Sequence, residues 1–227
     1  MVIPHLIQVT DIERPSQAIA QLIRQAFDEE RTVLWLVSGG SSIEVAVRGR
    51  QLLGPVEDGA VLLVGLIDER YGPAGHPDSN WQQLSDAGFD LSGVTPLPVL
   101  MDDWDIEQTA QAYDQLLSDL VSRVDVRIGL FGIGADGHTA GLLPHCPLLM
   151  VNDRFVGHFA AQDFQRISVT PALITALDEV VVYAVGEAKK TAVRQFLADG
   201  PIEDVPARLL KTAKNLTVYT DHREETA

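Results

Sequence analysis

The chain has 227 residues, of which 46% are apolar and 22% charged, and this is enough for one α/β domain with a buried core. Lys and Arg number 17 against 32 Asp and Glu, so the formal net charge is −15, which argues against nucleic acid or an anionic membrane as a partner. A small anionic ligand fits this charge only if Arg and Lys gather at its site.

A location in the cytoplasm is expected from the rest of the composition. The single cysteine, Cys146, excludes an internal disulfide and fits a reducing compartment. No apolar run approaches the roughly 20 residues that a membrane span needs. Residues 1–8 also lack the basic and apolar blocks of a secretory signal.

Apolar runs alternate with amphipathic segments along the whole chain, which favours strands alternating with helices. In the first half of the chain the pattern predicts a helix over 14–30, a strand over 32–37, a short helix from 43, a strand over 61–67, a helix from 78 or 79 to about 87, a short strand over 96–100 and a helix over 106–121. In the second half it predicts strands over 126–131, 155–160, 166–170, 179–185 and 216–219. Between these strands it predicts a short helix from 171, a helix ending near 198 and a short helix over 206–211.

A Gly/Ser loop separates the first predicted strand from its helix. Its sequence is Ser38-Gly39-Gly40-Ser41-Ser42. A loop of this kind at a helix start presents backbone N–H groups and hydroxyls to an anion such as a phosphate. A plain turn with a serine N-cap explains the same residues.

Three charged residues, Asp68, Glu69 and Arg70, directly follow the predicted strand over 61–67. Because charges at the mouth of a buried strand need partners, we interpret some of them as lining a ligand cleft, with a solvated turn as the alternative. The Gly/Pro-rich segment that follows, over 71–80, is longer than most connections between a strand and a helix. It is therefore a candidate lid.

The predicted strand over 126–131 leads into the segment Gly132-Ile133-Gly134-Ala135-Asp136-Gly137-His138. Ligands bind at the carboxyl ends of strands in open α/β sheets, so Asp136 and His138 are candidates for acid–base chemistry. The alternative is a capped loop with His138 in solvent.

Further along, Lys189 or Lys190 lies in the first turn of a predicted helix, where its positive charge opposes the helix dipole. A bound anion explains a lysine at this position, and so does a lysine side chain that extends into solvent.

Three segments together resemble the 6-phosphogluconolactonases of the glucosamine-6-phosphate isomerase/6-phosphogluconolactonase superfamily. They are VSGGSS at 37–42, DERYGP with a downstream DSN between 68 and 80, and GIGADGHTAGLLP at 132–144. The resemblance implies an α/β fold with a single doubly wound, mostly parallel sheet and helices on both faces, in one domain over residues 1–227. It also implies hydrolysis of 6-phospho-D-glucono-1,5-lactone to 6-phospho-D-gluconate in the oxidative branch of the pentose phosphate pathway, by a monomer or homodimer without cofactor or metal.

The same resemblance implies roles for the residues that match the motifs. His138 is expected to be the general base and Asp136 its partner. The loop over 38–42 is expected to hold the phosphate together with Arg166 and Lys189. The expected substrate-binding residues are Ser38, Gly39, Gly40, Ser41, Ser42, Asp68, Arg70, Gly134, Arg166 and Lys189.

The main alternative is an amino-sugar phosphate deaminase/isomerase of the same superfamily. Those enzymes typically carry Asn-Glu-Pro after the Asp-Gly-His motif, and this chain has Leu143 where their glutamate stands. They also tend to have tyrosine at the position of Arg70. A leucine cannot move a proton, so the lactonase is favoured. A non-catalytic sugar-phosphate-binding protein and a metal-dependent hydrolase using Asp68, Asp136 and His138 are further alternatives.

Overall fold

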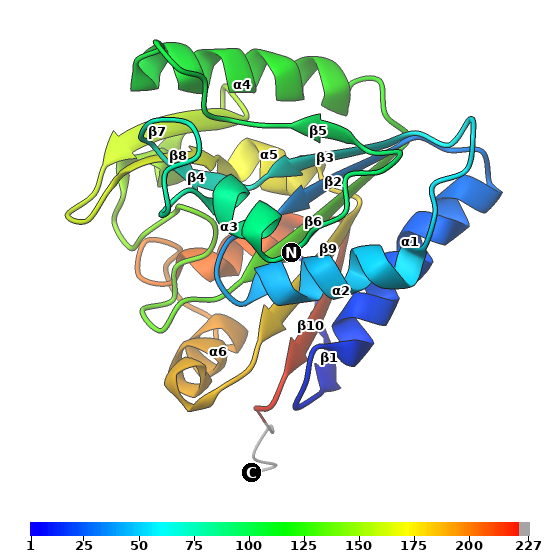
Figure 1. Cartoon of the computed structure of the whole chain (residues 1–227). Coiled ribbons are helices and arrows are strands. Elements are labelled where there is room, and N and C mark those ends of the chain that lie inside the picture. The colour runs from blue at the N-terminus through cyan, green and yellow to red at the C-terminus, as the bar shows by residue number, and fades with distance from the viewer. Residues whose placement is uncertain (223–227) are drawn as a thin grey trace.

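The computed structural model describes residues 1–222 and is built on a seven-stranded sheet in which all neighbouring strands are parallel (Figure 1). The spatial order is β1–β10–β9–β6–β2–β3–β5. The central strands are mostly apolar because both of their faces are covered, and every residue of β2 is buried. The strands are β1 (His5–Gln8), β2 (Val33–Val37), β3 (Leu62–Leu66), β5 (Thr95–Leu97), β6 (Val126–Gly132), β9 (Glu179–Ala184) and β10 (Asn215–Thr220).

Helices cover both faces of this sheet, as Figure 1 shows, so the predicted α/β class and doubly wound arrangement are confirmed. Helices α1 (Glu13–Asp28) and α2 (Ser42–Leu53) pack against each other on one face, and α5 (Pro171–Ala176) lies on the other. The remaining helical segments are α3 (Asn80–Asp86), α4 (Ile106–Val121), α6 (Lys190–Leu197) and the 3₁₀ turns η1 (Pro147–Met150), η2 (Glu187–Lys189) and η3 (Pro206–Thr212).

A second, smaller sheet was not part of the prediction. It contains β4 (Asp68–Arg70), β8 (Gln165–Val169) and β7 (Val156–Ala160) in the order β4–β8–β7, and both pairings are antiparallel. The charged run that follows β3 is therefore a short strand and not a solvated turn. In the register, Asp68 lies opposite Ser168 and Arg70 opposite Arg166, so these four side chains share one face.

The chain reverses its winding direction between β2 and β6. From β2 it proceeds through α2 to β3 and β5 on one side, whereas β6 is followed on its other side by β9 and β10. Loops at such a switch point diverge at the carboxyl ends of the two strands, and the crevice between them is the usual ligand site of open α/β sheets. The loops over 38–41 and 133–138 leave the sheet there.

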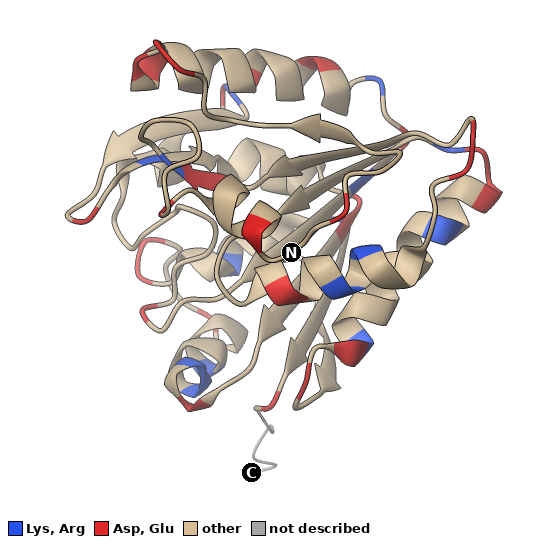
Figure 2. Ribbon diagram, in the orientation of Figure 1, with Lys and Arg blue, Asp and Glu red and all other residues tan. Residues whose placement is uncertain are grey.

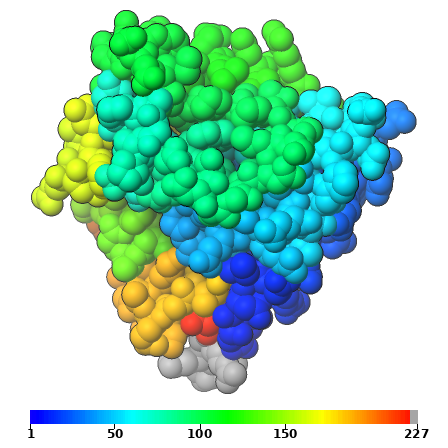
Figure 3. Space-filling view, in the orientation of Figure 1, coloured from blue at the N-terminus to red at the C-terminus, as the bar shows by residue number. Residues whose placement is uncertain are grey.

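The first and last strands lie side by side, because β1 pairs with β10 over His5–Gln8. The end of β1, drawn in dark blue, accordingly lies beside the red end of β10 at the lower end of the molecule (Figure 3). The sequence pattern did not predict β1, which has only four residues and none of them fully buried. Among residues 1–222 no helix combines the length and the apolar character that crossing a membrane requires.

Candidate active site

A cavity of about 370 Å³ lies at the switch point of the sheet. Its wall combines the β2–α2 loop, β4, the start of α3, the loop after β6, β8 and Lys189. All of the site residues expected from the sequence line it except Asp136 and Ser42. The lining residues are Ser38, Gly39, Gly40, Ser41, Asp68, Arg70, Asn80, Gly132, Ile133, Gly134, His138, Ala140, Arg166 and Lys189.

Asp136 and His138 form a hydrogen-bonded pair. The carboxylate Oδ1 of Asp136 lies 2.5 Å from Nδ1 of His138 and also accepts the backbone N–H of His138 at 3.1 Å. Partial burial alone would raise the pKa of Asp136, but the backbone N–H and the ring of His138 outweigh it and the pKa is lowered. His138 lines the cavity, and within the described residues its Nε2 has no hydrogen-bond partner.

The ring of His138 lies directly over Gly134. A Cβ atom at position 134 would fall 2.1 Å from Cε1 of the ring, so only glycine leaves room for it. The loop also uses two of its own N–H groups, since Gly134 donates to the carbonyl of His138 and Gly137 to that of Gly134. Those two N–H groups are therefore not available to a ligand.

The β2–α2 loop supplies donors at the opposite part of the wall. The N–H groups of Gly39, Gly40 and Ser41 have no acceptor among residues 1–222, and the hydroxyl of Ser38 is buried without a partner there. Nζ of Lys189 donates to Oγ of Ser41 at 2.7 Å, which places a cation on the loop. Burial lowers the pKa of Lys189, and a bound anion would counter that effect.

Ser42 does not line the cavity, and its contact with a ligand stays a prediction. Ser42 is the first residue of α2, it is fully buried, and it does not line the cavity. A Cβ on Gly132 would lie 3.5 Å from its Oγ, which shows that the hydroxyl faces the end of β6. Ser42 is thus part of α2 and not of the loop, and its side chain is buried in the protein interior.

Asp68 and the two arginines come from the small sheet. Burial raises the pKa of Asp68, while the charges of Arg166, His138 and Arg70 oppose that rise. Nη2 of Arg166 donates to Asp163 at 2.7 Å, and the guanidinium of Arg70 lies 5.3 Å from the ring centre of Phe164. In both arginines Nε is buried and has no partner among the described residues.

Glu69 and Asn80 are two residues whose place the sequence pattern did not reveal. Glu69 points away from the cavity, and its carboxylate accepts N–H groups of Arg70, Asn80 and Trp81 and the hydroxyl of Ser79. Burial raises the pKa of Glu69, although these hydrogen bonds act to lower it. Ser79 caps α3, as one of the two residues proposed for that role, and Asn80 follows it into the cavity wall.

Within the candidate lid over 71–80, Asn80 lines the cavity. No residue between 71 and 79 lines it. The hydroxyl of Tyr71 donates to the carbonyl of Trp104 at 2.7 Å, and the N–H of Ala74 donates to Asp102 at 3.3 Å. The segment is thus tied to the neighbouring loop around 102–104.

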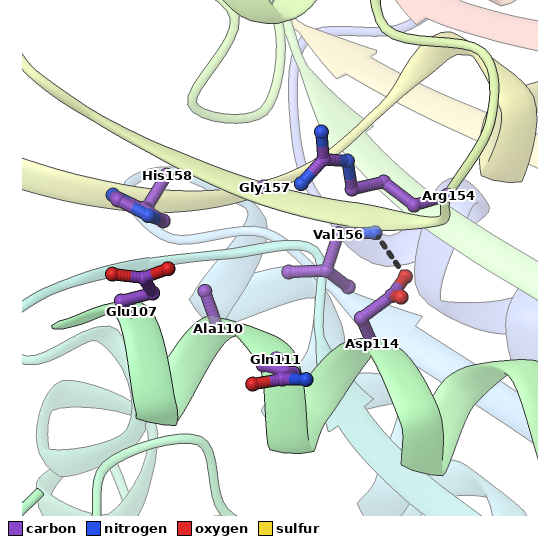
Figure 4. A pocket seen from close by; sticks show the side chains of 8 residues that line it. All are labelled: Glu107, Ala110, Gln111, Asp114, Arg154, Val156, Gly157 and His158. Atoms are coloured by element: carbon purple, nitrogen blue, oxygen red, sulfur yellow. Dashed lines mark hydrogen bonds between the residues drawn. The ribbon is translucent and has the colours of Figure 1, made fainter.

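A second cavity, also of about 370 Å³, lies between α4 and β7 and shares no lining residue with the first (Figure 4). Oδ1 of Asp114 is already bonded there to the N–H groups of Phe155 and Val156, at 2.7 and 2.8 Å. None of the expected site residues lies in it. The part of the chain that the structure describes holds no group of three or more His, Cys, Asp or Glu side chains arranged to bind a metal ion.

The fold and the first cavity define a class of protein: a doubly wound α/β protein in which the histidine of an Asp–His pair and a Gly/Ser loop line one cavity at the switch point. The family model described as glucosamine-6-phosphate isomerases/6-phosphogluconolactonase matches residues 12–219, and the chain belongs to that family.

Individual relatives agree with this assignment. A 6-phosphogluconolactonase of Synechocystis is 31% identical over 170 residues, which cover 69% of this chain and 69% of that protein. The solved structure of a 6-phosphogluconolactonase from Trypanosoma cruzi superposes with a TM-score of 0.77 at 22% identity, covering 97% of this chain and 95% of that one. A monomeric glucosamine-6-phosphate deaminase superposes almost as well, with a TM-score of 0.75 at 19% identity and coverage of 95% and 96%. The fold alone therefore does not separate the two activities.

Proposed function

We propose that this protein is a 6-phosphogluconolactonase, which hydrolyses 6-phospho-D-glucono-1,5-lactone to 6-phospho-D-gluconate in the oxidative branch of the pentose phosphate pathway. The observation that carries the proposal is the arrangement of one cavity. His138, held at Nδ1 by Asp136, lines it together with the Ser38–Ser41 loop and Lys189. A base and an anion-binding loop in one cavity suit a substrate with a reactive carbonyl and a phosphate.

In this proposal neutral His138 is the general base. The Asp136 carboxylate accepts a hydrogen bond from Nδ1–H of His138, which fixes the tautomer in which Nε2 has a free lone pair. Nε2 takes a proton from water as the water oxygen attacks the C1 carbonyl, and returns it to the ring oxygen as the C1–O bond breaks. A positioned base of this kind is worth about 10²–10⁴ in rate, and the Asp136 carboxylate stabilises the imidazolium in between.

The phosphate of the substrate would lie on the Ser38–Ser41 loop. Three unpaired N–H groups, the hydroxyl of Ser38 and the ammonium of Lys189 are donors that suit its oxygens. Binding energy from the phosphate, which does not react, then orients the lactone ring toward His138. Asp68, Arg70 and Arg166 face the same cavity and are proposed to contact the ring and its carbonyl.

The position of Leu143 supports hydrolysis over deamination. Its side chain packs against the hydrophobic core and does not line the cavity, so no carboxylate assists His138 from that position. Among the described residues, Asp68 is the acidic side chain that lines the cavity. The proposal therefore assigns the imidazole to water activation and not to ring opening of an amino sugar.

A paired assay tests the proposal. Freshly generated 6-phosphogluconolactone is offered to the protein and the rate is corrected for spontaneous hydrolysis, while glucosamine 6-phosphate is offered in parallel. We expect accelerated lactone hydrolysis and no release of ammonia from the amino sugar. Ammonia release, or lactone decay at the spontaneous rate, would contradict the proposal.

The proposal includes four statements about the setting of this activity. Residues 1–227 act as a single domain, supported by β4, which begins two residues after β3 ends and so joins the small sheet directly to the main one. The location is cytoplasmic, supported by a single cysteine that cannot form an internal disulfide. No cofactor takes part. The protein acts as a monomer or a homodimer.

A further inference from the structure

Asn80 is almost fully buried, with 1% of its surface exposed, and yet it forms part of the cavity wall. Its side-chain Nδ2 donates to the backbone carbonyl of Asp68 at 2.8 Å and to the Asp68 carboxylate at 3.3 Å. The donor from α3 to the Asp68 carboxylate is thus a neutral amide. The side chain links the start of α3 to β4.

The amide oxygen of Asn80 faces the other wall of the site. Oδ1 is buried and has no hydrogen-bond partner among residues 1–222. A Cβ atom built on Gly39 would lie 2.1 Å from this oxygen, so the side chain fills the space beside the phosphate loop. Asn80 therefore lies between the two parts of the cavity that are proposed to hold the ring and the phosphate.

The backbone of Asn80 is held independently of its side chain. The carboxylate of Glu69 accepts the N–H of Asn80 at 2.6 Å and that of Trp81 at 3.1 Å, and it accepts the hydroxyl of Ser79 at 2.8 Å. These bonds fix the first turn of α3 against β4. A change of the Asn80 side chain can consequently be made without removing the contacts that hold the helix.

The charge state of Asp68 depends on the donors that surround it. Burial favours its protonated form, and the cationic groups facing it are Arg166 on β8, Arg70 on β4 and the ring of His138 when protonated. The two arginines are also engaged elsewhere, Arg166 with Asp163 and Arg70 with the carbonyl of Asp78. Asn80 adds a donor that carries no charge and does not titrate.

We propose that Asn80 is a positioning residue of this site: its amide N–H groups hold the Asp68 carboxylate ionised and oriented to accept hydrogen bonds from the sugar hydroxyls, while its oxygen sets the spacing to Gly39. This inference rests on the proposed lactonase function for the identity of the sugar. An ionised carboxylate accepts from hydroxyl groups, whereas a protonated one competes with them as a donor.

Replacing Asn80 by aspartate separates the two contacts. The Asn80→Asp side chain has the same shape and keeps an oxygen toward Gly39, but it loses the donor toward Asp68 and adds a second carboxylate beside it. Two adjacent carboxylates share a proton, so the pair titrates with a raised apparent pKa. The matched control is Gln82→Glu on the same helix, where the exposed amide Nε2 donates to Asp86 at 2.7 Å outside the cavity.

Two binding probes report on the two halves of the cavity without turnover. Inorganic phosphate tests the loop, and glucitol 6-phosphate adds the hydroxyls of an uncharged sugar chain. For Asn80→Asp we expect glucitol 6-phosphate to bind at least about tenfold more weakly, as for a lost hydrogen bond to a charged group. Phosphate alone should be weakened by a smaller factor, because it senses only the repulsion of the added carboxylate beside Gly39. With the lactone, kcat/KM should fall similarly and its acid limb should move to higher pH. Gln82→Glu should leave all of these unchanged.

Equal weakening of both probes in the folded Asn80→Asp variant, or an unmoved acid limb, would overturn the inference. A double-mutant cycle covers the case in which Asn80→Asp does not fold. Asn80→Ala should weaken glucitol 6-phosphate binding in the parent protein, and should add little in an Asp68→Asn background if Asn80 acts through Asp68. Additive losses would refute the inference. A parent protein that binds both probes but leaves lactone decay unchanged would reject the proposed function and not this inference.

Discussion

Replacing Asp136 by asparagine tests how much the Asp136–His138 pair contributes to catalysis. In the parent protein the Asp136 carboxylate accepts the backbone N–H of His138 at 3.1 Å. Asparagine keeps an oxygen that can accept this hydrogen bond, so the loop should retain its shape. What disappears is the negative charge 2.5 Å from Nδ1 that stabilises the imidazolium formed when His138 takes a proton. The variant therefore isolates electrostatic stabilisation from loop geometry.

The expected size of this effect follows from the exposure of the pair. Unit charges about 4 Å apart interact by about 1 kcal/mol in water and about 4 kcal/mol near a protein surface. The side chains of Asp136 and His138 are 51% and 35% exposed, so the interaction falls between these limits. We expect Asp136→Asn to lower kcat about 10- to 100-fold, less than the roughly 10⁴-fold effect in the buried triad of a serine protease.

The assay is steady-state hydrolysis of freshly generated 6-phosphogluconolactone. A second Asp–His pair provides the control, because Nε2 of His145 lies 3.4 Å from Asp204, and neither residue lines the cavity. Asp204→Asn should leave kcat unchanged. If Asp136→Asn kept kcat within about threefold of the parent while folding normally, the carboxylate would have no part in stabilising the base.

Three further changes test other parts of the argument. His138→Asn removes the base and should lower kcat at least about a hundredfold; near-normal turnover would exclude His138 as the base. Lys189→Met removes the cation bonded to Ser41 and should raise KM at least about tenfold with a smaller change in kcat, and an unchanged KM would place the phosphate elsewhere. Asp178 accepts donors from Arg127 and Lys214 at 2.6 Å each, and despite partial burial these lower its pKa below the usual 3.8. Its stabilisation is therefore complete above pH 3.8 and is lost as pH falls through the lower folded value. Asp178→Asn should lower the free energy of unfolding, measured with urea at pH 7, by about 1–3 kcal/mol. The difference in stability between the parent and the variant should become smaller below pH 4.

The sequence was informative wherever a strand is buried on both faces. The run Val33–Val37 has no polar residue, and Val126–Gly132 has only Arg127 near its start. Such runs are the mark of a central parallel strand, and the loops that follow them lie at the carboxyl edge of the sheet. That rule placed the Asp136–His138 loop at the ligand edge, and the resemblance to the 6-phosphogluconolactonases joined the Gly/Ser loop to the same site. Local chemistry then indicated an anion site and a base.

The small sheet shows what local patterns cannot supply. Strand β4 has three residues, all charged, and it exists because its backbone pairs with β8 almost a hundred residues later. Nothing near Asp68 in sequence fixes that register, so the position of Arg166 beside Arg70 depends on tertiary contacts. The same holds for Asn80, which had the local signature of a helix start and reaches Asp68 only because Glu69 anchors that helix to β4. The inward turn of Ser42 likewise depends on the residue at which α2 begins.

The register of the small sheet also explains how an acidic protein can accommodate a phosphorylated sugar. Acidic residues are spread over many elements around the molecule (Figure 2), and at 0.15 M ionic strength charges farther than about 8 Å are largely screened. Within the cavity basic residues outnumber acidic ones: Arg70, Arg166 and Lys189 line it, and among the described residues Asp68 is the one acid that does. At about 4 Å each cation is worth several kcal/mol toward an anion near a protein surface. Because β4 and β8 place the two arginines opposite each other, the pairing of two short strands determines the charge of the site, and the net charge of −15 acts only on the approach of the substrate.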